Sequence, residues 1–322
     1  MKTEKMNPHP IHTLTVQAHS KTYPELWNVQ SPPKTLYIQG QEKSLELLNQ
    51  LPMRGLAIVG TREPTPHTAH FLKSQVHALR GTKLVILSGF ARGIDTIAHQ
   101  AALDVGLPTL AILGAGLDIP YPRENEKLRE RLLNQGGLLI SEFPPGTTAY
   151  ASNFLQRNRL IAAWSQATWV VEAPFRSGSL NTAYWAREHQ RTCYSTPCFP
   201  GDVHQQGNQK LIDQDHATPY WGVHSLGSTW LELATHLKTS LKPGLIVRNL
   251  DSSPSSEEVI LSNKVSVLTS LQGGAQVGEL LDWAISVDWT PQKFYTALEN
   301  AIQMGLLIDK NGLLLKNEVV SD

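Results

Sequence analysis

Residues 55–89 read GLAIVGTREPTPHTAHFLKSQVHALRGTKLVILSG, and this stretch decides the fold class. It begins and ends with short apolar runs, GLAIVG and KLVILSG, each about the length of an average strand. Residues 67–80, between the two runs, have the pattern of a helix. A strand, a helix and a second strand in this order form a βαβ unit, in which the two strands lie parallel.

The same alternation continues along the chain after this stretch. Apolar runs follow at residues 108–114, 137–143, 167–173 and 191–197, and helical patterns lie at 94–103, 124–134, 158–165 and 180–189. We therefore predict an α/β fold of the Rossmann-like, doubly wound kind, with a mostly parallel sheet covered by helices on both faces. Right-handed crossovers place the βα loops of such a sheet at one edge, where ligands bind.

The composition changes on both sides of this core. The segment before it is polar and contains several prolines, so we expect an appendage that packs against the core. A later segment is rich in serine, proline and acidic residues, which is typical of a linker. The expected division is an N-terminal appendage at residues 1–54, the Rossmann-like domain at 55–238, the linker at 239–263 and a small domain at 264–322.

The pattern of the small C-terminal domain predicts a winged helix. Residues 264–272 and 276–284 each have the pattern of a short helix. Thr290-Pro291 is suited to the N-cap and first position of a third helix. The sequence then predicts a hairpin at residues 306–316, with its turn at Asn311-Gly312.

The overall composition excludes several classes of protein. The 322 residues include 28 lysines and arginines and 28 aspartates and glutamates, so a nucleic-acid site would have to be a local cluster. Cys193 and Cys198 are too few for a disulfide framework, and no ligand set has metal-site spacing, so we expect no bound metal. No apolar run suits a signal peptide or a membrane span, and we expect a cytoplasmic protein that does not bind membranes.

Four loops at the predicted sheet edge carry groups that bind anions. Glycines let backbone amides approach a ligand, helix N-termini attract negative charge, and arginine offers a charged fork to phosphate oxygens. The loops are Gly60-Thr61-Arg62, Ser88–Gly93, Gly114–Gly116 and Ser177-Gly178-Ser179. A lone glycine after a strand is often only a tight turn, but the repetition along one edge favours a binding site.

A further cluster, Phe154–Arg159, combines Arg157, Asn158 and Arg159 with an aromatic ring near the start of a predicted helix. Arginines neutralise backbone phosphates, and a phenyl ring can stack on an unpaired base. The same pattern also fits two arginines on a solvated helix face.

Signatures of common nucleotide enzymes are missing from the sequence. There is no GxxxxGK[ST] motif, and GAGLDIP at residues 114–120 is not GxGxxG, so we expect neither a P-loop ATPase nor a dinucleotide cofactor. Glu172 ends an apolar run near the binding edge and fits either a general base or a structural carboxylate. No nucleophile–base pair is visible from the spacing, and we expect a protein that is not an enzyme and holds no cofactor.

Several phrases together resemble the DprA/Smf family. In the family's order, over residues 23–217, the chain reads YPELW, PPKTLYIQG, IVGTR, LSGFARGIDTIAHQAAL, AILGAGLDIPYPRENEKL, LLISEFPPG, FLQRNRLIAAWS, VVEAPFRSGSLNTAYWARE and GNQKLI. The resemblance implies a Rossmann-like fold, a homodimer and binding of single-stranded DNA. It also implies that the protein protects incoming DNA and delivers it to a RecA-type recombinase during DNA uptake in natural transformation.

The resemblance further implies a pocket for DNA phosphates. The residues that match the family's motifs there are Arg62, Ser88, Gly89, Arg92, Gly93, Arg157, Asn158, Arg159, Ser177, Gly178 and Ser179. We add Phe154 as a ring on which a base could stack.

The chain departs from the family's usual pattern in several places. Leu155 replaces a usual proline, Ala163-Trp164 replaces a glycine and a small aliphatic residue, and Asn181 replaces an aliphatic residue. The segments at residues 196–202 and 213–218 also differ from the family's usual forms. These departures bear on partner recognition and dimer geometry more than on the pocket.

Two other functions stay open from the sequence. A sensor of a nucleotide-derived ligand would use the same pocket, because one set of phosphate-binding groups serves a DNA strand or a free nucleotide. A nucleotide-processing enzyme, such as a nucleoside-monophosphate phosphoribohydrolase, usually has a PGGxGTxxE loop. Residues 177–188 occupy the comparable position but read SGSLNTAYWARE.

Overall fold

The chain forms two compact units, residues Met1–Ser240 and Leu241–Asp322. The structure, a computed structural model, describes residues 11–18, 23–198, 202–230, 275–276, 280, 289, 291–303, 307–310 and 313–316. No helix in this described part of the chain is long and apolar enough to cross a membrane.

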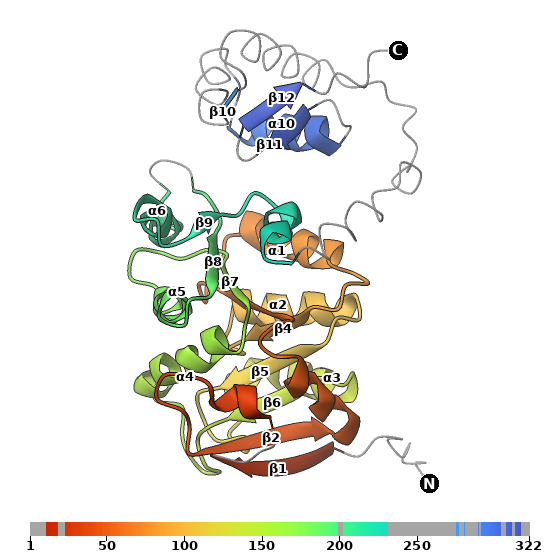
Figure 1. Cartoon of the computed structure of the whole chain (residues 1–322), viewed down its shortest axis with the longest axis vertical. Helices are drawn as coiled ribbons and strands as arrows, with labels where there is room; N and C mark the ends of the chain where they lie inside the picture. Colours follow the sequence, from red (N-terminus) through yellow and green to blue (C-terminus); the bar gives the residue numbers. More distant parts are fainter. Residues whose placement is uncertain are drawn as a thin grey trace. The chain divides into compact units, whose positions relative to one another are not determined.

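The first unit is built around a sheet whose described strands lie in the order β1-β2-β6-β5-β4-β3-β7-β8-β9 (Figure 1). The strands are β1 Ile11–Gln17, β2 Thr35–Gln41, β3 Gly55–Val59, β4 Val85–Ser88, β5 Thr109–Leu113, β6 Leu138–Ser141, β7 Ala167–Val170, β8 Thr192–Ser195 and β9 Thr218–Pro219. Neighbouring strands from β6 across to β9 are parallel, whereas β1 pairs antiparallel with β2 and β2 with β6. The predicted Rossmann-like, mostly parallel sheet is confirmed.

Helices cover both faces of this sheet. They are α1 Pro66–Ala78, α2 Ile94–Asp104, α3 Glu126–Asn134, α4 Ala151–Ala163, α5 Ser179–Glu188 and α6 Gln206–Asp213, with short 3-10 helices η1 Pro24–Trp27, η2 Glu42–Gln50, η3 Arg123–Asn125 and η4 Val223–Ser228. In β3, Leu56 and Ile58 share a core with Leu72 of α1, while Ala57 shares the opposite core with Leu160 of α4. Burial on both faces explains why the parallel strands are continuous apolar runs.

The N-terminal segment contributes strands β1 and β2 to the same sheet, so it is more than an appendage packed against the core. Figure 1 shows both strands, in red, at one edge. The fully buried Trp164 donates a hydrogen bond from Nε1 to the carbonyl oxygen of Leu26 in η1, at 3.1 Å. The large ring at position 164, a departure from the family's usual pattern, thus supports the N-terminal segment.

Helix α4 begins at Ala151, whereas the sequence predicted a start near Asn158. Tyr150 has extended backbone at the N-cap, and the side-chain amide of Asn153 donates to the carbonyl oxygen of Thr148 at 3.3 Å. The first turns carry exposed residues and no regular apolar spacing, which is the signal on which a helix prediction depends. The whole Phe154–Arg159 cluster is therefore helical.

The second unit contains an antiparallel sheet in the order β10-β12-β11, formed by β10 Ala275–Gln276, β11 Leu307–Lys310 and β12 Leu313–Lys316. Helix α10, Pro291–Gln303, and the pairing of Lys310 with Leu313 match the predicted third helix and hairpin. The expected helix at 264–272 lies outside the described residues, and so does most of the one at 276–284, whose first residue belongs to β10. The winged helix as a whole stays a prediction.

Candidate nucleic-acid interface

A cavity of about 500 Å³, here called the central pocket, lies where β3, β4 and β7 end and where α4 and α5 begin. Its lining is Val59, Gly60, Thr61, Arg62, Ala91, Asp95, Ala151, Phe154, Leu155, Arg157, Asn158, Ile161, Pro174, Arg176, Ser177, Gly178, Ser179 and Thr182. Seven of the twelve residues predicted for the site are in this lining, and Ser88, Gly89, Arg92, Gly93 and Arg159 are not. This is the edge at which open α/β sheets bind their ligands.

The loop from β4 to α2 is held by a buried carboxylate that the sequence pattern did not indicate. Asp95 accepts hydrogen bonds from the backbone amides of Gly89 and Ala91, at 3.1 and 3.2 Å. Its burial raises the pKa of the carboxyl, and the charge of Arg157 partly opposes that rise. The buried Ser88 hydroxyl donates to the carbonyl oxygen of Ile58 at 2.6 Å. Ser88 and Asp95 thus shape the loop, and the Ser88 hydroxyl is already engaged within the sheet.

Arg157 is buried at the base of the central pocket, with 3% of its surface exposed. Its guanidinium donates to the carbonyl oxygens of Gly89, at 2.8 Å, and Ile112. Burial lowers the pKa of Arg157 to about 10, although the charge of Asp95 acts in the opposite direction. Arg157 therefore links α4 to the β4–α2 loop by a hydrogen bond, and its positive charge lies in the lining of the central pocket.

Arg62 and Arg176 provide exposed positive charge at the central pocket. Neither has an ion-pair partner among the described residues. Arg92, in contrast, lies outside the pocket lining and forms an exposed ion pair with Glu124. The sequence pattern indicated Arg62 but not Arg176, whose position directly before the Ser177-Gly178-Ser179 loop was the available signal.

Phe154 lies within an aromatic and cationic cluster. Its ring centroid is 5.3 Å from that of Tyr121 and 5.4 Å from the guanidinium carbon of Arg62. The ring packs closely against Gly114, where a Cβ atom would lie only 2.6 Å from Cδ1 of Phe154. Gly114 of the Gly114–Gly116 loop thus leaves room for the Phe154 ring, and Tyr121 extends the aromatic surface.

The start of α5 supplies small polar groups to the central pocket. The Ser177 and Ser179 hydroxyl oxygens lie 2.8 Å apart. The side-chain amide of Asn158 donates to the carbonyl oxygen of Gly178 at 3.3 Å and to Oδ1 of Asn181 at 3.4 Å. The polar Asn181, another departure from the family's usual pattern, therefore has a polar partner on α4.

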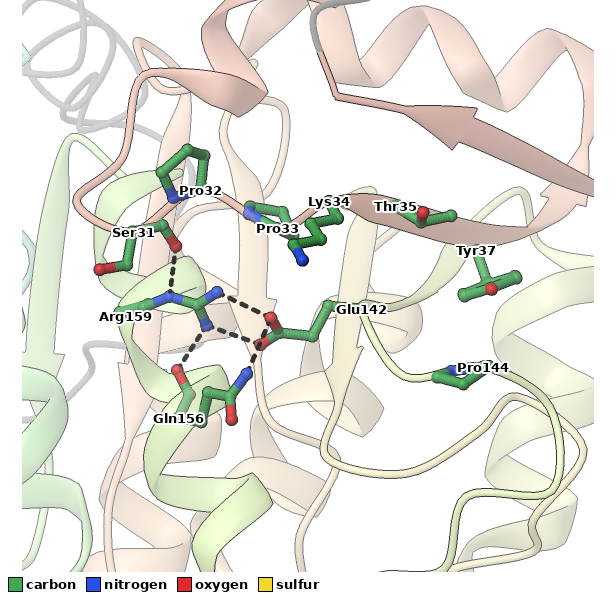
Figure 2. Close-up of a pocket in the computed structure, with 10 residues that line it drawn as sticks. All are labelled: Ser31, Pro32, Pro33, Lys34, Thr35, Tyr37, Glu142, Pro144, Gln156 and Arg159. Atoms are coloured by element: carbon green, nitrogen blue, oxygen red, sulfur yellow. Dashed lines mark hydrogen bonds and ion pairs between the residues drawn. The ribbon is translucent and has the colours of Figure 1, made fainter.

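Arg159 does not line the central pocket with Arg157, and its contact with a DNA phosphate stays a prediction. Residues two apart on a helix project about 200° apart around its axis, so the two side chains leave α4 on different sides. Arg159 forms an ion pair with Glu142 through two hydrogen bonds, at 2.6 and 2.7 Å, and both side chains are 6% exposed. It also donates to the carbonyl oxygens of Ser31 and Gln156, at 3.0 and 2.7 Å (Figure 2).

Arg159 belongs to a second cavity of about 430 Å³, here called the flanking pocket. The residues that line it are Ser31, Pro32, Pro33, Lys34, Thr35, Tyr37, Glu142, Pro144, Gln156 and Arg159. The sequence did not indicate this pocket, because its lining comes from three segments that are far apart in the chain: the N-terminal segment, the end of β6 and α4.

Glu172 is fully buried and has a structural environment. Its carboxylate accepts hydrogen bonds from the backbone amide of Thr65, at 3.1 and 3.2 Å, and from the Thr65 hydroxyl at 2.8 Å. Thr65 is the N-cap residue of α1. Of the two roles the sequence allowed for Glu172, these contacts favour the structural carboxylate.

Comparison with known proteins agrees with this architecture. Residues 14–230 match the family described as DNA recombination-mediator protein A. The Smf protein of Synechocystis is 42% identical over 191 residues, which are 59% of this chain and 47% of that protein. The Smf protein of Escherichia coli is 38% identical over 206 residues, 64% of this chain and 53% of that protein. The chain thus spans about half the length of these curated relatives.

The solved structures that are similar to the chain include two of DNA processing protein A. The X-ray structure of DNA processing protein A (DprA) from Streptococcus pneumoniae has a TM-score of 0.60 at 33% identity, over 69% of this chain and 74% of that one. DNA processing protein A from Helicobacter pylori, described for its single-stranded DNA binding mode, has a TM-score of 0.58 at 28% identity, over 69% and 96%. Because the family match covers more than half of its residues, this chain belongs to the DNA recombination-mediator protein A family, the DprA/Smf family.

Proposed function

We propose that this protein binds single-stranded DNA in the central pocket. The observation that carries the proposal is the exposed Arg62 beside the Phe154 ring, with Arg176 and the amide-rich start of α5 in the same cavity. Arginines neutralise phosphates, and an aromatic ring stacks on bases of any sequence. Together they suit a strand bound through its backbone and exposed base faces.

The preference for a single strand follows from access to the bases. In a duplex the base faces are stacked inside the helix, so they cannot reach a ring that lines a pocket. Stacking of a base on an aromatic side chain contributes about 1–3 kcal/mol, which duplex DNA would not gain at Phe154. We therefore expect binding to single strands that is at least about fivefold tighter, with little sequence preference.

Titration of the purified protein with single-stranded and duplex oligonucleotides at several salt concentrations tests this proposal. Affinity should fall as salt rises, because phosphate contacts release counterions. Arg62→Ala should weaken binding to all sequences and reduce the salt slope by about one. Arg187→Ala is the matched control, because Arg187 is exposed near the other end of α5 and is not in the lining of either pocket. Equal or tighter binding of duplex DNA would refute the proposal.

A mononucleotide titration separates this function from that of a nucleotide sensor. The central pocket, at about 500 Å³, is also large enough for a free nucleotide. We expect mononucleotides to bind far more weakly than oligonucleotides, since they make only a fraction of the phosphate and stacking contacts. Comparable affinities would favour the sensor. We propose no catalytic step.

The wider role that we propose is protection of incoming DNA and its delivery to a RecA-type recombinase during natural transformation. Membership of a recombination-mediator family supports this role. We expect a homodimer in solution and a cytoplasmic location, where such a recombinase acts. Light scattering tests the dimer, and RecA strand exchange on protein-coated single strands tests the delivery. If the protein fails to stimulate strand exchange, the delivery role is wrong while DNA binding stands.

A further inference from the structure

The flanking pocket lies at the same sheet edge as the central pocket. Antiparallel pairing places Tyr37 of β2 opposite Ser141 of β6, so the start of β2 meets the end of β6 there. Glu142 directly follows β6, and Arg62 comes shortly after the end of β3. The order β6-β5-β4-β3 separates these strand ends by three spacings, about 14 Å in all. A flexible strand of a few nucleotides can span such a distance.

Helix α4 forms a wall of both pockets. Leu155 and Arg157 line the central pocket, whereas Gln156 and Arg159 line the flanking pocket. Leu155 and Gln156 are exposed on the first turns of the helix. A strand that leaves Phe154 can therefore cross these turns and enter the flanking pocket.

The walls of the flanking pocket are held in place by the buried ion pair of Arg159 and Glu142. Figure 2 shows this pair tied to Ser31 and Gln156, with Lys34 and Tyr37 projecting from the segment that begins β2. Because the charges of Arg159 and Glu142 neutralise each other, Lys34 supplies the remaining formal charge of the lining. The pocket therefore suits an anion and not a cation.

The other groups of the flanking pocket suit a nucleobase. The partly exposed Tyr37 gives an aromatic surface on which a base can stack, and the exposed Pro144 adds an apolar surface to the same lining. The Gln156 amide nitrogen donates to Glu142 at 3.1 Å, which leaves its amide oxygen to accept a hydrogen bond from a base. Lys34 is exposed and has no ion-pair partner among the described residues, so its ammonium is available to a phosphate.

We propose that the flanking pocket is a second subsite for the same DNA strand, in which Lys34 binds a phosphate and the Gln156–Tyr37 surface receives an unpaired base. This inference rests on the proposed function and adds to it the direction of the strand across the protein, over α4 toward the N-terminal segment. The two pockets then act in series on one strand, and the length of DNA bound exceeds what the central pocket alone contacts.

Fluorescence anisotropy with thymidine oligomers of about 4 to 16 nucleotides tests the second subsite, since this range covers the site sizes of single-strand-binding domains. Affinity of the wild-type protein should rise with length in two steps. The double variant Lys34→Ala/Gln156→Ala should keep the first step and lose about fivefold or more of affinity for the longest oligomers. Lys73→Ala, an exposed lysine of α1 that lines neither pocket, should leave both steps unchanged.

The outcomes separate the two proposals. If Arg62→Ala lowers affinity at all lengths but the double variant binds the longest oligomers as the wild type does, the subsite is refuted and the proposed function stands. If the folded wild type binds no oligomer, both are refuted. Competition by thymidine monophosphate that the double variant abolishes, with oligomer affinity unchanged, would assign the flanking pocket to a free nucleotide and overturn the proposal. Circular dichroism and thermal melting establish that the variants are folded.

Discussion

Arg62 and Arg159 show how differently two arginines of one predicted site behave at the residue scale. The sequence correctly placed Arg62 at a pocket, because a residue in a loop after a strand reaches the sheet edge whatever its rotamer. It did not indicate that Arg159 lines a different pocket, because the direction of a helical side chain depends on where the helix begins and on which groups the neighbouring elements present. Glu142 and the carbonyl oxygen of Ser31 are those partners, and neither is close to Arg159 in sequence.

Removal of Arg159 should therefore lower stability. Arg159→Ala leaves the Glu142 carboxylate buried without its partner, at a cost of about 3–5 kcal/mol. Arg62→Ala, at an exposed position, should change the free energy of unfolding by no more than about 0.5 kcal/mol. Urea unfolding of both variants measures the difference, and Arg159→Ala/Glu142→Leu should recover part of the loss. Wild-type stability of Arg159→Ala would contradict the role of the buried pair.

His99 should make the stability of the protein depend on pH. Its Nδ1 lies 2.7 Å from the Thr109 hydroxyl, whose hydrogen goes to the carbonyl oxygen of Ile86, so Nδ1 is the donor and Nε2 carries no proton. Nε2 has no hydrogen-bond partner, and burial, with a smaller contribution from the charge of Arg157, lowers the pKa of His99 to about 3. The unfolded chain, with an ordinary pKa of about 6.5, takes up a proton at this position before the folded chain does.

The stability contributed by the neutral His99 is thus present above about pH 6.5 and is lost as the pH falls toward 3. The expected loss between pH 6.5 and pH 5 is about 2 kcal/mol. Urea unfolding at a series of pH values measures it, with His99→Leu as the comparison, because this variant has no imidazole to titrate. The idea fails if both proteins lose stability equally over this range.

At the scale of the element, the loops were easier to predict than the helix that separates the pockets. The Ser177-Gly178-Ser179 loop lines the central pocket as expected, since glycine and serine at the start of a helix have a local physical reason to be there. The predicted helix was shorter than α4, because the first turns of α4 carry polar residues whose helical state depends on tertiary packing. That error concealed the fact that α4 has a pocket on each side.

Gly93 ends the Ser88–Gly93 loop and lies against the backbone of Thr61 and Arg62. Its replacement should therefore disturb both the Ser88–Gly93 loop and the Gly60-Thr61-Arg62 loop. Its φ of +73° lies in the left-handed region, and a Cβ atom there would lie 2.5 Å from the carbonyl oxygen of Thr61. Gly93→Ala should therefore cost about 1–3 kcal/mol of stability and displace the Arg62 loop. Gly178→Ala is the matched control, because its φ is −63° and a Cβ atom there meets nothing within 4 Å.

Thermal melting of Gly93→Ala and Gly178→Ala, together with DNA titration of Gly93→Ala, checks this prediction. The melting temperature should fall clearly for Gly93→Ala and stay within a degree or two for Gly178→Ala. DNA affinity of Gly93→Ala should fall several-fold as the Arg62 loop moves. Equal stability of the two variants would show that the junction tolerates a side chain.

At the scale of the whole molecule, the parallel strands were predicted and strands β1 and β2 were not. Each parallel strand is buried on both faces and is therefore a short apolar run. Strand β2 alternates buried and half-buried residues over most of its length, and β1 has mostly exposed side chains, so neither is a continuous apolar run like those of the parallel strands. The N-terminal segment was consequently taken as an appendage instead of part of the sheet.

The residues of both pockets belong to the first unit, so that unit should bind DNA without the second. Removal of the chain from about residue 255 onward should leave single-stranded DNA affinity within a few-fold of the full-length value, about 1 kcal/mol. Titration of the truncated protein, with its fold and dimeric state checked, measures this. A folded, dimeric truncation with most of its DNA affinity lost would show that the second unit is part of the DNA site.

Arg157 and Arg159 fasten α4 to the rest of the protein on its two sides, through carbonyl oxygens of Gly89, Ile112 and Ser31. The backbone of α4 is thus held in place before any ligand arrives, so the helix itself loses little conformational entropy on binding. A flexible ligand does lose entropy, and this loss grows with every nucleotide that is ordered. A ligand stiffened in advance, such as an oligonucleotide with locked sugars, would gain affinity here without making any new contact.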